Sequence, residues 1–278
     1  MNTKKWLVPL CAALALSPIT GWATPILGSS LASFAVLGAA GVTNVPTSTI
    51  GGNLGSAPNA SVGGGYIFTS GSVQANTALA QQAQLDLDAA ILTVNGMGPG
   101  ITLGVDLTGT IFPGVYTVPA GATNLSGALV LDGGGSNEAL WVFLFPSTLI
   151  TSTTSTVTVV HVGDAAQVGV YWSVGSAATL NGLTFAGNVL AQDLISSDGN
   201  LTLDCGRLLS SEKQVTLNQD HISTECGGLP SSGFAQGVVI AGPGVPGGNA
   251  LPEPGILLLL GSGLAGVFVS RKNRAAIG

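Results

Sequence analysis

The stretch TFAGNVLAQDLISSDGNLTLDCGRLLS, residues 184–210, contains one short pattern twice. Gly187 is followed by Leu190, and Gly206 is followed by Leu209, so the two copies align at a shift of nineteen residues, from 187 to 206. Glycine lets a chain turn where a side chain would obstruct the corner. The regular spacing of a glycine and a leucine predicts a chain that winds in coils and turns at each glycine. The leucine of each coil is expected to point inward and to pack on the leucine of the coil below.

The segments after each copy repeat as well. Asp193–Ser196 and Gln214–Leu217 align at a shift of about twenty-one residues. A repeat of about twenty residues with two or three short strands is typical of one coil of a β-solenoid, in which neighbouring coils satisfy each other's backbone groups. The alternative is an ordinary β-sandwich with two similar strands.

Composition supports a mainly β fold. Only 7% of the 278 residues are charged and 42 are glycine, which is far from the composition of a helical protein. Short runs rich in β-branched residues alternate with Gly, Asn, Ser and Asp turns, as in Thr156–Val160 and Val168–Trp172. Between the two ends the cations are Arg207 and Lys213. A body this poor in positive charge excludes nucleic acid as a partner and has no basic patch for anionic lipid.

One segment differs from this pattern. Residues 76–94 (NTALAQQAQLDLDAAILTV) contain neither Gly nor Pro. Ala78, Leu85, Ala89 and Leu92 fall on one side at helical spacing. The segment therefore predicts an amphipathic helix that packs against the sheet through these four residues.

The first residues are typical of a secretory signal. Lys4 and Lys5 precede a short apolar run, and small residues end at Ala23, where we expect signal peptidase to cut. The predicted signal peptide is 1–23, and an N-terminal membrane anchor is the alternative. The apolar run is shorter than the roughly 20 residues that a membrane span needs.

The last residues form a second targeting segment. Pro252, Glu253 and Pro254 precede an apolar run over residues 255–269 and a basic end. This order resembles the PEP-CTERM sorting tag of Gram-negative bacteria, which an exosortase-type membrane protease is thought to cut. The resemblance implies a secreted or cell-surface protein that meets the membrane through a short transmembrane segment within residues 252–274. A permanent C-terminal anchor is the alternative. Residues 227–251 are Gly/Pro-rich and predict a linker, so the mature domain is expected to span residues 24–226.

Two cysteines remain in that domain. Cys205 and Cys226 predict a disulfide, because a secreted chain with an even number of cysteines usually pairs them. Two free thiols are the alternative.

A set of motifs in a fixed order points to a family. They are FAVL at 34–37, IGGNLG at 50–55, PGVY at 113–116, VFLF at 142–145 with STL at 147–149, YWSVGSAATL at 171–180 and TFAGNVLA at 184–191. Together they resemble the DUF3494 type of ice-binding protein over about residues 26–222. The resemblance implies a right-handed β-solenoid of triangular cross-section with one long α-helix packed along a face. It also implies a flat face with loose Thr-Ala/Gly-x-Thr/Asn motifs that binds ice.

Three stretches match those motifs in part. Residues 151–154 (TSTT) and 181–184 (NGLT) each depart from the pattern at one position, and residues 197–200 (SDGN) depart at two, Ser197 and Asp198. Threonine suits such a face because it carries a methyl and a hydroxyl on a stiff side chain. The expected ice- or water-facing residues are Thr151, Thr154, Thr179, Asn181, Thr184, Ser197 and Asn200. The alternative for each stretch is a polar turn or a solvent-facing strand.

Motifs for chemistry do not emerge from the sequence. There are two histidines without a zinc-ligand spacing, and no Gly-x-Ser-x-Gly elbow occurs. We therefore expect no enzyme activity, no metal and no cofactor. The partner expected is ice or ordered water. An adhesive matrix protein that contacts exopolysaccharide is the alternative, and a carbohydrate-active enzyme would need to use Asp193 and Asp198.

Overall fold

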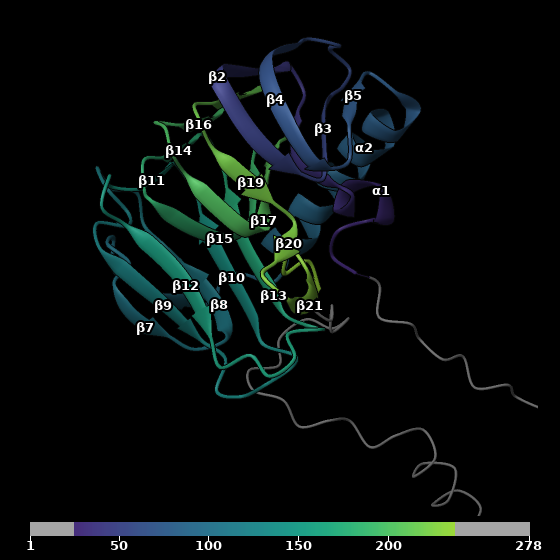
Figure 1. The fold of residues 1–278 in the computed structure, drawn as a ribbon. Helices are drawn as coiled ribbons and strands as arrows, with labels where there is room; N and C mark the ends of the chain where they lie inside the picture. Colours follow the sequence, from purple (N-terminus) through teal and green to yellow (C-terminus); the bar gives the residue numbers. More distant parts are fainter. Residues whose placement is uncertain (1–24, 237–278) are drawn as a thin grey trace, which may run out of the picture. The chain divides into compact units, whose positions relative to one another are not determined.

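The computed structural model describes residues 25–236, and in this part of the chain nineteen strands join one sheet. All strand pairs of that sheet are parallel. Each turn of the chain, which we call a coil, places its strands beside the equivalent strands of the neighbouring coil (Figure 1). The strands fall into three ladders, which we name A, B and C. Within a coil the chain passes from A to B to C and then enters A of the next coil.

Ladder A consists, in spatial order, of β6 (Ile101–Thr102), β8 (Gly114–Thr117), β10 (Leu140–Phe145), β13 (Gly169–Val174), the second halves of β15 (Thr184–Ala191) and β17 (Thr202–Ser210), β1 (Phe34–Gly38), β3 (Asn53–Ser56) and β5 (Val73–Ala75). Ladder B consists of β11 (Leu149–Ile150), β14 (Ala178–Leu180), β16 (Ile195–Ser197), β18 (Gln214–Leu217) and the starts of β2 (Gly41–Gly51) and β4 (Val62–Ser70). Ladder C consists of β7 (Gly109–Ile111), β9 (Ala128–Asp132), β12 (Thr156–Val160), the first halves of β15 and β17, β19 (His221–Ser223) and the ends of β2 and β4.

The order of coils in space does not follow the order in sequence. The coil of β17, β18 and β19 stacks directly on the coil of β1 and β2, with Leu208 paired to Val36 and Thr216 paired to Thr43. In Figure 1 the purple strand β2 accordingly lies beside the green strand β19. The N-terminal coils therefore cover the edge that the last C-terminal coil would otherwise expose.

The repeat in residues 184–210 corresponds to two stacked coils. Gly187 pairs with Gly206 and Leu190 pairs with Leu209, which confirms the shift of nineteen. Gly187 has φ +98°, and a Cβ on Gly206 would overlap the Gly187 carbonyl oxygen. Both glycines are therefore required at the corner where ladder C passes into ladder A. The following strands pair Ser196 with Thr216, a shift of twenty, and the predicted alignment at about twenty-one was one residue too long.

The predicted direction of the leucines is wrong. Leu190 and Leu209 pack in the apolar cluster that contains helix α2 (Ala78–Asn95), outside the coils. Their neighbours Val189 and Leu208 point into the coils instead. Side chains alternate between the two faces of a strand, so an inward pattern and a helix-facing pattern differ by one residue.

Aromatic side chains fill part of the coil interior. Phe143 stacks on Trp172 with ring centroids 4.3 Å apart and on Tyr116 at 5.6 Å. These residues hold paired positions on β8, β10 and β13. The parallel register thus brings aromatic residues from three coils into one column.

The long helix forms where predicted but packs with another face. α2 begins after Thr77, whose hydroxyl accepts a hydrogen bond from the Ala80 amide at 3.3 Å. Its buried residues are Ala80, Ala83, Leu87, Ala90 and Val94. Leu85 and Leu92, predicted to face the sheet, are 63% and 74% exposed. The contact is therefore formed by a stripe of three alanines with Leu87 and Val94, and not by Leu85 and Leu92.

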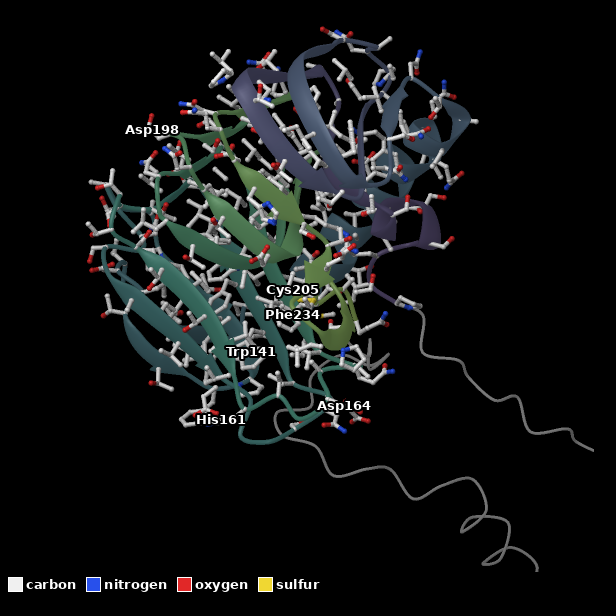
Figure 2. All side chains as sticks on the ribbon, viewed as in Figure 1. Trp141, His161, Asp164, Asp198, Cys205 and Phe234 are labelled. Atoms are coloured by element: carbon white, nitrogen blue, oxygen red, sulfur yellow. A yellow bond between two sulfur atoms is a disulfide. The ribbon has the colours of Figure 1, made fainter. Side chains whose placement is uncertain are left out.

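The folded part extends past residue 226. Cys205 and Cys226 form the predicted disulfide, and β20 (Glu225–Cys226) pairs with β21 (Leu229–Ser232) as an antiparallel hairpin. Phe234 is buried beside the disulfide, as Figure 2 shows. The expected linker therefore cannot begin at residue 227, because residues through Gln236 pack on the domain.

Both targeting segments lie outside the described residues, so the expected cut after Ala23 and the Pro252–Glu253–Pro254 motif have no structural description here. Neither helix found between residues 25 and 236 has the length and apolar character to cross a bilayer.

Candidate functional site

The central strands of ladder A are closed to solvent, whereas the outer strands β5 and β6 are exposed. Its outward-facing residues Leu190 and Leu209 belong to the apolar cluster that also contains residues of α2 and of α1 (Ser29–Ala32). Even its polar outward residues, such as Asn188 and Arg207, have no exposed surface. A surface that contacts a large ligand must therefore lie on ladder B or ladder C.

Ladder B carries one continuous outward row. The register pairs Ile150 with Thr179, Thr179 with Ser196, Ser196 with Thr216, and Thr216 with Thr43. Thr179, Ser196 and Thr216 each lie between two buried residues of their strand, so their side chains point away from the core. Four successive coils thus present a hydroxyl at one position.

The hydroxyls of this row are regularly placed. Adjacent strands lie about 4.7–4.9 Å apart, which sets the spacing of the row. The Thr43 hydroxyl donates to the Thr216 hydroxyl at 3.2 Å, so these two neighbouring members are hydrogen-bonded to each other. None of the four is titratable, and the row has no charge of its own.

Charged side chains flank ladder B instead of interrupting it. A shallow hollow at the edge toward ladder A is lined by Ala40, Ala177, Asp193, Leu194, Lys213 and Gln214. At the opposite edge Asp198 projects from the turn into ladder C, where Figure 2 labels it. The centre of the face stays uncharged between these edges.

The corner between ladders B and C is held by a buried carboxylate. Asp220 accepts hydrogen bonds from the Leu201 amide at 3.0 Å and the Asn218 amide at 2.9 Å, and from the Ser197 hydroxyl. Burial raises the pKa of Asp220 despite these donors. The same corner joins β19 to the N-terminal coil, because the Asp220 amide donates to the Ser48 hydroxyl at 2.9 Å.

Ladder C has a longer but interrupted row. Thr156, Thr184 and Thr202 pair in succession, and His221 follows before Thr49. The His221 imidazole lies 3.2 Å from the Asp204 carboxylate, and both side chains are substantially exposed. A histidine with a neighbouring carboxylate therefore interrupts the row of ladder C between Thr202 and Thr49.

The structure distributes the predicted residues over several places. Thr179 lies on ladder B, whereas Thr184 lies on ladder C, so these two do not share a face. Thr154 and Asn200 are exposed in turns, and Asn181 is partly buried at a corner. The Asn181 side chain donates to the Thr151 carbonyl at 2.9 Å and so joins two coils.

Two predicted residues do not face solvent. Thr151 is 1% exposed, and its hydroxyl accepts hydrogen bonds from the Asn181 amide at 2.9 Å and the Gly182 amide at 3.1 Å. Ser197 is 7% exposed and donates to Asp220. Both residues satisfy backbone or carboxylate groups at corners, which accounts for their polarity without a role in binding.

Three members of the ladder B row were missed. Ser196 and Thr216 would have been found by aligning residues 193–197 with 213–217 at a shift of twenty. Thr43 could not be found in this way, because it comes from the N-terminal coil and reaches ladder B only through the tertiary stacking. Across residues 25–236, no group of three His, Cys, Asp or Glu side chains is arranged to hold a metal ion.

Comparisons with known proteins identify the chain. Residues 36–223 match the family model described as ice-binding-like, and residues 250–273 match the PEP-CTERM protein-sorting motif. A relative named ice-binding protein from Nostoc sp. (strain HG1) is 35% identical over 260 residues, covering 90% of this chain and 87% of the relative.

Solved structures give the same result. The crystal structure of an ice-binding protein from an Antarctic biological consortium has a TM-score of 0.63 and 29% identity, covering 72% of this chain and 91% of that chain. A second, from the Antarctic ascomycete Antarctomyces psychrotrophicus, has a TM-score of 0.61 and 27% identity, covering 71% of this chain and 97% of that one. These relatives are ice-binding proteins by name. The chain therefore belongs to the ice-binding-like family and carries a PEP-CTERM sorting motif, which supports sorting to the cell surface or the exterior.

Proposed function

We propose that the protein binds ice or ordered water through the outward row of ladder B, formed by Thr179, Ser196, Thr216 and Thr43. The observation that supports this choice is the in-register stacking of four hydroxyls without a charged member. Ladder A is excluded because α2 covers it. Ladder C is less suited because the Asp204–His221 pair interrupts its threonines.

The physical basis is the ordering of water. A β-branched threonine has few side-chain rotamers, so a row of threonines on a rigid ladder holds hydroxyls and methyls at fixed spacing. A long charged side chain keeps more freedom and strong hydration, which would disturb an ice-like layer. As the finer form of the fold we propose a right-handed solenoid of triangular cross-section, in which ladder B is one flat side.

The two open ladders allow a matched experiment. Thr216→Tyr places a bulky ring in the centre of the ladder B row, and Thr184→Tyr places the same ring between Thr156 and Thr202 on ladder C. We expect thermal hysteresis and inhibition of ice recrystallisation to fall at least tenfold for Thr216→Tyr and to stay within twofold of wild type for Thr184→Tyr. Circular dichroism and thermal unfolding of both variants would check that the fold is intact.

The outcomes separate the alternatives. Loss of activity in Thr184→Tyr alone would transfer the proposal to ladder C. Absence of activity in the wild-type mature chain at high micromolar concentration would reject ice binding and leave the role of a matrix protein that contacts exopolysaccharide.

We further propose how the chain is processed on its way to the cell surface or the exterior. Signal peptidase would cut after Ala23, and an exosortase-type protease of a Gram-negative bacterium would cut near Pro252–Glu253–Pro254. Mass spectrometry of the exported protein would show a new N-terminus at Thr24 and a C-terminus near residue 254. An exported protein that retains residues 255–278 would contradict the second cut.

A further inference from the structure

One row of ladder A is covered by a segment of the chain rather than by α2. The register places Tyr171, Asn188 and Arg207 side by side on three successive coils. All three are fully buried. Over them runs the segment from Leu229 to Gln236, which we name the strap.

The three side chains contact consecutive carbonyl groups of the strap. Arg207 donates to the carbonyls of Ser232 at 3.2 Å and Gly233 at 3.1 Å. Asn188 donates to the Phe234 carbonyl at 2.9 Å. Tyr171 contacts the Ala235 carbonyl at 2.6 Å and the Gln236 carbonyl at 2.9 Å. The three side chains thus contact five consecutive backbone carbonyls of the strap. Because they contact the backbone, these interactions depend little on the side chains of the strap.

Backbone groups and glycines complete this site. The Val170 amide donates to the Phe234 carbonyl at 3.0 Å, and the Gln236 amide donates to the Val168 carbonyl at 3.2 Å. A Cβ on Gly169 would overlap the Gln236 carbonyl oxygen, and a Cβ on Gly233 would overlap the Arg207 guanidinium. Glycine therefore stands on each side of the contact where the backbone approaches most closely.

The buried cation fits a carbonyl-rich peptide. Within residues 25–236 Arg207 has no carboxylate partner, and its further hydrogen bonds go to the Asn188 side chain at 2.8 Å and to the Ala32 carbonyl. An unpaired buried charge is costly unless its donors are satisfied. The strap supplies part of that satisfaction, so strap and arginine stabilise each other.

We infer that Tyr171, Asn188 and Arg207 form a binding site for an extended peptide backbone, filled in cis by the strap, which fixes where the sorting tail leaves the domain. The site lies at the start of ladder A, next to the corner with ladder C. Because each coil runs from A to B to C, this is the corner that ladder B does not touch. A chain held by its tail would therefore leave the row of Thr179, Ser196, Thr216 and Thr43 unobstructed, and this last step rests on the proposed function.

Cutting the connection to the strap tests the site directly. Gly227 and Gly228 lie in an exposed turn after the disulfide, with no neighbour within 4 Å of an added Cβ. A protease recognition sequence inserted between them in the mature chain allows cleavage in the folded state. We expect the cleaved C-terminal fragment to stay bound in size-exclusion chromatography, and a synthetic peptide of residues 229–236 to displace it.

Variants on both sides of the contact sharpen this test. Gly233→Ala changes the strap alone and should speed fragment release at least tenfold. Tyr171→Phe removes one hydroxyl and should speed release about three- to tenfold. Gly104→Ala is the matched control, because an added Cβ there has no neighbour within 4 Å, and it should release like wild type.

Two results would overturn the inference. One is immediate loss of the fragment from the cleaved wild-type protein. The other is equal release from Gly233→Ala and Gly104→Ala. Fragment retention requires no ice, so its failure leaves the ice-binding proposal intact, and failure of the ice assay leaves the peptide site intact.

Discussion

Ladders A and B consist of the same coils, yet their outward rows have opposite surroundings. On ladder A the polar row of Asn188 and Arg207 is fully buried under the strap, and leucines are covered by α2. On ladder B the hydroxyl row stays partly exposed, with charges only at its edges. A parallel register aligns equivalent residues into rows on every face. What covers a row then decides whether it contributes to stability or to binding.

The comparison predicts that ladder A tolerates little change. Arg207→Ala should lower the free energy of unfolding by about 3–5 kcal/mol, because it leaves the carbonyls of Ala32, Ser232 and Gly233 without a buried donor. Urea unfolding measures the effect. Lys213→Ala, which removes an exposed cation, should stay within about 0.5 kcal/mol of wild type. Equal losses in the two variants would contradict the role given to Arg207.

A second prediction concerns the face of α2 that covers ladder A. Leu87→Ala should cost about 2–5 kcal/mol, since Leu87 has no exposed surface. Leu92→Ala provides the same change at a 74% exposed position and should cost at most about 0.5 kcal/mol. Thermal or urea unfolding of the pair decides between the observed face and the one predicted from sequence. A larger loss of stability for Leu92→Ala than for Leu87→Ala would show that the helix packs through the face predicted from the sequence.

The corner between ladders B and C predicts a pH effect. Burial raises the pKa of Asp220 in the folded state above its unfolded value, so the folded protein binds this proton more tightly. Its contribution to stability is complete below the unfolded pKa, about 3.9, and is lost as the pH rises through the folded pKa. The melting temperature of wild type, measured from pH 3 upward, should therefore fall relative to that of Asp220→Asn. Parallel curves for the two proteins would refute the assignment.

The smallest effect is expected on ladder B itself. Ser196→Thr completes a row of four threonines by adding one methyl group between Thr179 and Thr216. Stability should change by at most about 0.5 kcal/mol, whereas thermal hysteresis should rise up to about twofold. Thr202→Ser on ladder C removes a methyl from the other row and should leave hysteresis unchanged. A change in thermal hysteresis for Thr202→Ser but not for Ser196→Thr would indicate that ladder C, and not ladder B, is the ice-binding face.

Much of the fold could be predicted from the sequence because the repeated residues lie close together in the chain. The pairing of Gly187 with Gly206 follows from their spacing, and the disulfide between Cys205 and Cys226 was predicted from the even number of cysteines in a chain expected to be secreted. The helix was predicted over residues 76–94 from the lack of Gly and Pro, and it is observed over Ala78–Asn95. Its contact face was not, since both Leu85–Leu92 and Ala83–Leu87 satisfy helical spacing. Periodicity identifies a stripe, but the space beneath the helix selects which stripe fits.

The candidate site was harder to predict from the sequence than the fold was. Thr179 was predicted, but Thr151 and Ser197 proved to be corner residues with buried hydroxyls. A threonine in a turn motif looks the same whether it accepts amides at a corner or faces water. Thr43 joins the row from a strand more than a hundred residues away, and the pairing of β2 with β18 is visible only in the folded chain.

The sequence by itself determined the mainly β fold, the spacing of Gly187 and Gly206, the glycine corners, the disulfide and the family, because each depends on residues close in the chain or on motifs in a fixed order. Tertiary structure alone decided that the N-terminal coils stack on the C-terminal coil, which helix face is buried, and which hydroxyls share a ladder. Those features depend on side-chain volume and on long-range strand pairing. Many distant partners satisfy the same backbone hydrogen bonds, and packing selects one of them.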